Sequence, residues 1–257
     1  MASPAAGTRR AAAVLACLSL LLAGCAGPKD ITAVAPYELE IVLKEAAVLF
    51  RDRGGGRVTL RPGRAADLAA AVGQGAAADL WFCMDPAWTD TLQARALLRP
   101  GMARVLAWDS LVAVVPAGRG PAPGNQYLLP NYGRIAVADT LADLRGRGMK
   151  QGLAMMGVWN ALRDRVVVCA DAPAALAMVE RGEVDAAILP ATLARRSSRV
   201  EVGFKLSEGT HEVLACTGAV LSGARHPEAA AAFLEFLSGP SGREILRRHG
   251  FLGVDPQ

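Results

Sequence analysis

The sequence lacks the short motifs by which many hydrolases, metalloenzymes and nucleotide-binding enzymes are recognised. It contains no G-x-S-x-G, no H-E-x-x-H, no G-x-x-x-x-G-K-[ST] and no G-x-G-x-x-G. Its three histidines, His211, His226 and His249, lie far apart in the chain, so no histidine metal cluster or Ser-His-Asp arrangement is indicated. The sequence shows no nucleophile–base pair that would support an enzymatic function. We therefore expect no catalytic residue, no metal and no cofactor.

A strong net charge and a paired-cysteine motif are also missing. The formal net charge is +4 in 257 residues, with no cluster of basic residues interleaved with aromatics, which argues against a nucleic-acid partner. No C-x-x-C occurs. Cys83, Cys169 and Cys216 lie in apolar, strand-like surroundings, so we expect buried thiols; one disulfide with a leftover thiol stays open, because sequence cannot pair them.

Only the N-terminus has a long apolar run, and it is too short to span a bilayer stably. Arg9 and Arg10 precede this run at residues 11–23, and the ending Leu-Ala-Gly-Cys at residues 22–25 resembles a bacterial lipobox. The pattern predicts a signal peptide over residues 1–24, a lipidated Cys25 and a tether over residues 25–30. The alternative is an ordinary cleaved signal. We expect a lipoprotein anchored in a membrane of the cell envelope, on the periplasmic side.

The remaining chain alternates strand and helix patterns in two successive units, which is typical of an α/β fold with parallel strands. Expected strands are residues 31–34, 57–60, 80–83, 135–138, 166–169, 186–189, 200–205 and 212–221, with two more strands crossing within 105–115. Expected helices are residues 38–51, 65–72, one starting at Asp85-Pro86, 145–156, 172–181, 226–237 and 240–249.

Two repeated α/β units predict two lobes. We place lobe 1 at residues 31–110 and 220–257 and lobe 2 at residues 111–219. Ligands of open α/β sheets bind at the carboxyl ends of strands, against helix starts. A cleft between the lobes is therefore the expected ligand site.

Three stretches resemble the solute-binding proteins of ABC importers, in particular the molybdate-binding group. They are Gly75–Phe82 with Asp85 and Trp88; Ala136–Asp139 with Trp159 and residues 175–188; and the tail from Ala229 to Phe251. The resemblance implies a type II periplasmic-binding-protein fold, in which two α/β lobes joined by crossing strands close on a ligand. It also implies a monomer that captures a small oxyanion such as molybdate or tungstate and delivers it to an ABC permease.

The resemblance also maps ligand-binding positions onto this chain, and here the residue types differ. The matching positions and their neighbours are Pro36, Tyr37, Arg64, Ala65, Ala66, Arg145, Gly146, Ala172 and Pro190. The family supplies two serines and a tyrosine where this chain has the run 33–37, Ala65 and Pro190. Each missing buried donor weakens an anion complex by about 1–3 kcal/mol.

Two alternatives follow from these differences. If Arg64 and Arg145 turn into the cleft, the ligand is a more strongly charged or carboxylate-bearing anion, held bidentately. If the site has been lost, the chain is a sensor or accessory module with a protein partner.

Overall fold

The computed structural model describes residues 29–119, 121–139, 144–207, 209–211 and 214–253. The expected signal peptide and Cys25 lie outside these residues. None of the helices that the structure describes is both long and apolar enough to cross a membrane.

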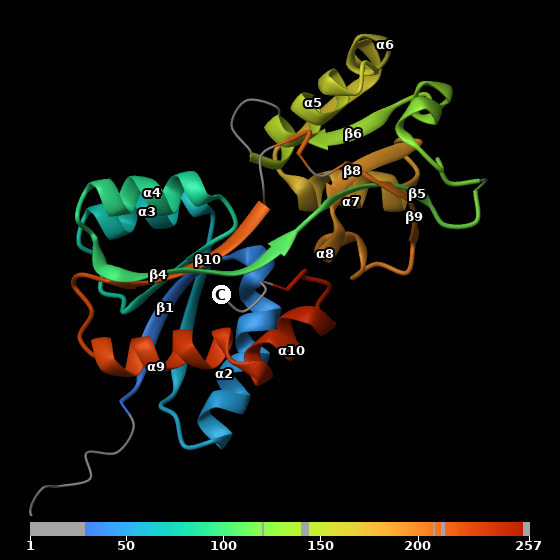
Figure 1. Ribbon diagram of the computed structural model, residues 1–257. Helices are drawn as coiled ribbons and strands as arrows, with labels where there is room; N and C mark the ends of the chain where they lie inside the picture. Colours follow the sequence, from blue (N-terminus) through green and yellow to red (C-terminus); the bar gives the residue numbers. More distant parts are fainter. Residues whose placement is uncertain (1–28, 120, 140–143, 208, 212–213, 254–257) are drawn as a thin grey trace, which may run out of the picture.

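The first lobe is built on a five-stranded sheet in the order β2-β1-β3-β10-β4 (Figure 1, lower left). Strand β1 runs parallel to β2 and β3, whereas β10 runs antiparallel to β3 and β4. Its elements are β1 (Ile31–Pro36), η1 (Tyr37–Leu39), α2 (Glu40–Asp52), β2 (Val58–Gly63), α3 (Ala65–Gly73), β3 (Leu80–Cys83), α4 (Pro86–Ala94), β4 (Leu98–Asp109), β10 (Leu214–Leu221), α9 (Pro227–Ser238) and α10 (Pro240–Arg248).

The second lobe repeats this plan with a sheet in the order β7-β6-β8-β5-β9. Strand β6 runs parallel to β7 and β8, and β5 runs antiparallel to β8 and β9. Its elements are β5 (Leu111–Pro116), η2 (Gln126–Asn131), β6 (Ile135–Ala138), α5 (Leu144–Met155), α6 (Trp159–Leu162), η3 (Arg163–Arg165), β7 (Val166–Cys169), α7 (Ala172–Arg181), β8 (Ala186–Pro190), α8 (Ala191–Ala194) and β9 (Val200–Lys205).

The chain passes between the lobes twice. Strand β4 ends at Asp109 in the first sheet and β5 begins at Leu111 in the second, as the continuous green ribbon of Figure 1 shows. The return lies between β9 and β10. We expected it at residue 220, but β10 belongs to the first sheet from Leu214 onward, because its backbone pairs with β3 and β4. An apolar strand alone does not reveal which sheet it joins.

Local sequence explains where the elements start and stop. Asp85 and Asp171 accept backbone N–H bonds from Ala87 and Ala174 and so cap α4 and α7. Gly182 ends α7 in the left-handed conformation, at φ 70°.

The expected α/β class with two lobes is confirmed. Cys83, Cys169 and Cys216 are buried and form no disulfide.

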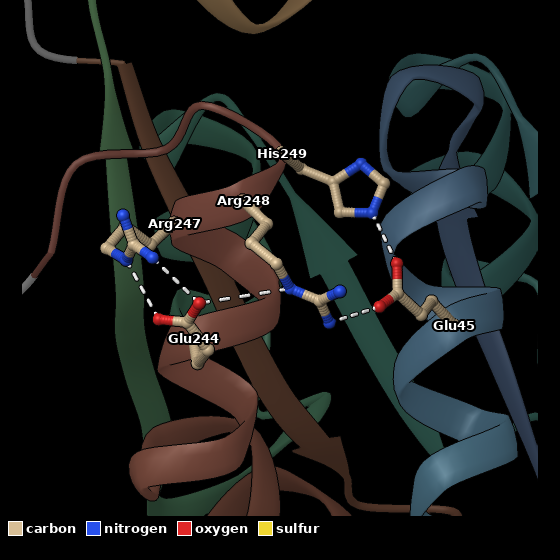
Figure 2. Close-up of polar contacts among 5 residues, drawn as sticks. All are labelled: Glu45, Glu244, Arg247, Arg248 and His249. Atoms are coloured by element: carbon tan, nitrogen blue, oxygen red, sulfur yellow. Dashed lines mark hydrogen bonds and ion pairs between the residues drawn. The ribbon is translucent and has the colours of Figure 1, made fainter.

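The C-terminal helix α10 is fixed to α2 by a small charged cluster (Figure 2). Glu45 of α2 accepts from the Arg248 guanidinium and lies 2.7 Å from His249 Nε2. The hydrogen bond with His249, with further help from Arg248, lowers the pKa of Glu45 below its ordinary value of 4.5. Glu244 binds Arg247 within α10 itself. Only Glu45 therefore joins the two helices within this cluster of five residues.

We predict that Glu45→Gln lowers the melting temperature at pH 7 by about 2 °C, because a partly exposed ion pair contributes up to about 1 kcal/mol. A carboxylate with a lowered folded pKa stabilises the protein above its unfolded pKa, and the contribution is lost as the pH falls through the folded value. The difference between the variant and the parent should therefore vanish well below pH 4.5. Calorimetry across pH tests this. Glu244→Gln is the control and should show a smaller difference; equal losses in both variants would contradict a helix-joining role.

Candidate functional site

A cavity of about 150 Å³ lies between the two lobes. This is smaller than the pockets that hold drug-sized ligands, so the cavity suits a small solute. Its lining residues are Tyr37, Glu38, Gly63, Arg64, Ala65, Ala66, Met84, Asp85, Trp88, Asp109, Asp171, Ala172, Pro173, Pro190, Thr192, Leu193, Arg196 and Phe251.

Most of these residues lie at the beginnings of helices. The starts of η1, α3 and α4 approach the cavity from the first lobe, and the starts of α7 and α8 approach it from the second. Free N–H groups and the helix dipole make such starts attractive to anions. The chain itself, however, already occupies several of them.

Prolines and carboxylates neutralise the starts of α4 and α7. Pro86 and Pro173 remove backbone donors in the first turns of these helices. Asp85 and Asp171 place their own carboxylates at the helix starts, where each accepts a backbone N–H. An external anion therefore meets negative charge at both places.

At the start of α8, backbone N–H groups are already bonded to residues of the segment that crosses between the lobes. Ala191 donates its N–H to the Ser110 carbonyl. Asp109, which is 6% exposed, accepts from the backbone N–H of Ser110 and from both the N–H and the hydroxyl of Thr192. This network joins the end of β4 in the first lobe to α8 in the second.

Among the three longer helices that border the cavity, α3, α4 and α7, only α3 has a start without a side-chain cap. Its N-cap is Arg64, which makes no side-chain capping bond. The first intrahelical bond is donated by Leu68 to the Arg64 carbonyl, so the N–H groups before it, those of Ala65 and Ala66 included, have no acceptor within the helix. The Arg64 guanidinium has no hydrogen bond or ion pair within the described part of the chain. Backbone donors and the Arg64 cation thus meet at one edge of the cavity.

Two polar contacts reach from one lobe to the other. Arg196, which follows α8, donates from Nη2 to the Glu38 carbonyl of the first lobe at 2.6 Å. Arg147 of α5 lies 3.5 Å from Asp85 of the first lobe. Burial lowers the pKa of Arg196, and the carboxylates of Glu38 and Asp109 oppose that effect. Because an arginine remains protonated near neutral pH, a second cation borders the cavity.

The structure places the expected ligand residues unevenly. Six of them line the cavity: Tyr37, Arg64, Ala65, Ala66, Ala172 and Pro190. Pro36 is buried at the end of β1 and does not line it. Gly146 is buried against the end of β6, where an added Cβ would collide with the Asp139 carbonyl oxygen. Arg145 belongs to α5, but its side chain lies outside the described part of the structure. Ligand binding by all of them stays a prediction.

Sequence reasoning missed several lining residues as site residues. Asp171 and Asp85 were detectable as helix caps, and a cap at the carboxyl end of a strand already faces the expected cleft. Asp109, Thr192 and Arg196 follow no recognisable motif; they line the cavity because the end of β4 and the segment around α8 meet where the lobes join. Among the described residues, no group of three His, Cys, Asp or Glu side chains is arranged to hold a metal ion.

Two α/β lobes, joined by crossing strands and enclosing a small cavity at helix starts, define a two-lobed binding protein. The family model for bacterial extracellular solute-binding proteins matches residues 31–252. The chain belongs to this family.

Named relatives agree with this assignment. The molybdate-binding protein ModA of Escherichia coli K12 is 30% identical over 92% of this chain and 95% of its own length. A putative ABC transporter substrate-binding lipoprotein of Bacillus subtilis, YvgL, is 25% identical over 70% of this chain and 69% of its own. The periplasmic molybdate-binding protein of Azotobacter vinelandii has a similar fold, with a TM-score of 0.73, 18% identity, and coverage of 88% of this chain and 100% of its own. The expected periplasmic-binding-protein fold is thereby confirmed.

We predict that Asp109→Asn lowers the free energy of unfolding by about 2 kcal/mol, because an amide nitrogen replaces one of two oxygens that accept from three donors. Thr192→Val removes only the hydroxyl bond and should cost about half as much. Urea unfolding monitored by circular dichroism measures both. An Asp109→Asn protein as stable as the parent would contradict the role given to this network.

Proposed function

We propose that this protein is the substrate-binding component of an ABC importer and that it captures a small oxyanion in the cavity between its lobes. The observation that carries the proposal is the open start of α3, where the N–H groups of Ala65 and Ala66 and the Arg64 guanidinium border the cavity. Family membership and the names of the relatives support the same class of solute. Molybdate and tungstate are therefore the first ligands to test.

In the proposed mechanism the two lobes close on the ligand and no reaction is catalysed. The anion binds the first lobe at α3, and contacts from the second lobe form only when the lobes meet. Ligand stabilises the closed form by its differential affinity for that form. The Arg196–Glu38 and Arg147–Asp85 contacts reach from one lobe to the other and support the closed arrangement. We further propose that the closed monomer delivers the anion to a membrane permease and catalyses no reaction.

We predict that Arg64→Gln weakens oxyanion binding by about tenfold to a hundredfold, because a charge-assisted hydrogen bond contributes about 1.5–3 kcal/mol. Ala65→Pro should weaken it at least about fivefold, since proline removes one N–H yet is tolerated at the first helical position. Isothermal calorimetry with molybdate, tungstate, sulfate and phosphate measures both effects.

Arg61→Gln is the matched control for the lost charge. Arg61 lies three positions before Arg64, donates to the Ala77 carbonyl and does not line the cavity. It should bind like the parent. Absence of binding to every anion in the parent protein would refute the proposed function, whereas a loss shared equally by Arg61→Gln would refute the α3 site alone.

We also propose that the lipobox-like ending at residues 22–25 directs acylation of Cys25 and holds the protein at a membrane. Cys25→Ser should move the protein from the membrane fraction to the soluble extract, because acyl chains supply the membrane affinity. Fractionation followed by mass spectrometry of the N-terminal peptide tests this. An N-terminal peptide without lipid in the parent would contradict the proposal.

A further inference from the structure

The unused hydrogen-bonding groups that border the cavity differ between the two lobes, although carboxylates line it from both and Arg196 lines it from the second. The first lobe offers donors: the open start of α3 and the Arg64 guanidinium, beside the Tyr37 hydroxyl. The second lobe offers an acceptor at the start of α7, where Asp171 lies and Pro173 lacks an N–H. A ligand that touches both lobes must therefore satisfy both kinds of group.

Asp171 is the acceptor with unused capacity. Its Oδ1 accepts the Ala174 N–H at 2.8 Å, and its Oδ2 has no donor among the residues that the structure describes. The other acidic residues at the cavity have interactions of their own: Asp85 with Ala87 and Arg147, Asp109 with Ser110 and Thr192, and Glu38 through further contacts. A carboxylate accepts hydrogen bonds and donates none.

A fully ionised oxyanion cannot satisfy Asp171. Sulfate and molybdate carry no proton near neutral pH, so contact would bring two acceptors and two negative charges together. An oxyanion that keeps one proton can donate its O–H to Asp171 while its charged oxygens bind Arg64 and the N–H groups of α3. Arg196, the other cation lining the cavity, is held by the Glu38 carbonyl.

Resting on the proposed oxyanion function, we infer that this cavity selects a protonated tetrahedral oxyanion of the hydrogen phosphate class over fully ionised anions of the sulfate and molybdate class. Asp171 is the specificity-determining residue. Asp171 repels a fully ionised anion, and this repulsion supplies the selectivity. This would separate the chain from the relatives that are named for molybdate.

The test compares anions of similar shape. Phosphate, arsenate, sulfate and molybdate are titrated into the purified protein at pH 7 by isothermal calorimetry. We expect phosphate and arsenate to bind at least about tenfold more tightly than sulfate and molybdate. Asp171→Asn should reduce that ratio to within about threefold, mainly by improving sulfate binding, because the amide is neutral and can donate.

Asp171→Asn is suited to this test because asparagine caps a helix about as well as aspartate, so α7 should persist, and thermal melting checks that. Asp164→Asn is the charge-matched control; its carboxylate is 90% exposed and lies near Arg163. Sulfate or molybdate binding as tightly as phosphate would overturn the inference and leave the proposed function standing. An unchanged ratio in a folded Asp171→Asn protein would overturn it as well. No binding of any of the four anions would instead refute the proposed function.

Discussion

The geometry of parallel strands is the constraint on which this site depends. A helix that follows a strand begins at the strand's carboxyl end, so β2–α3 and β3–α4 in one lobe, and β7–α7 in the other, turn toward the same gap. Two chain crossings join the two lobes, and Asp109 binds the first crossing to α8. The helix starts would attract anions without any further residue, so side chains only decide which of them stay available.

At most of these helix starts, groups of the protein itself take the place that an anion would occupy. Pro86 and Pro173 remove N–H groups, and Asp85 and Asp171 supply carboxylates that belong to the protein. Capping stabilises α4 and α7 by about 1 kcal/mol each, but it also places negative charge where an anion would otherwise bind. Among the helices of eight or more residues that border the cavity, only α3 has neither a proline in its first turn nor a side-chain cap, although Asp67 lies in that turn. The donors of the proposed site at α3 are backbone N–H groups and a guanidinium rather than the serine hydroxyls that the family resemblance implies.

The fold could be predicted from the sequence because its signals are local. Helix 172–181 and strand 80–83 have the expected bounds, since Asp171 and Gly182 punctuate the first and an unbroken apolar run defines the second. The sheet to which β10 belongs could not be predicted, because strand pairing is tertiary. Some residues of the candidate site could likewise be predicted from the sequence, and others could not. The family resemblance indicates Ala65 and its neighbour Arg64, which line the cavity, and also Gly146, which lies against Asp139 and does not line it. Arg196 comes from an element that carries no motif.

Replacing neutral hydroxyls with a guanidinium changes how selectivity must arise. Several converging hydroxyls fit one size and shape of anion, whereas an arginine on an exposed helix start attracts any anion with two suitable oxygens. The first lobe then captures by charge and discriminates little. Discrimination must come from the second lobe, which contacts the ligand only on closure. Because closure requires differential affinity for the closed form, an anion that binds Arg64 but repels Asp171 would occupy the open form without closing it. In this proposal, Arg64 in the first lobe serves capture and Asp171 in the second lobe serves selection.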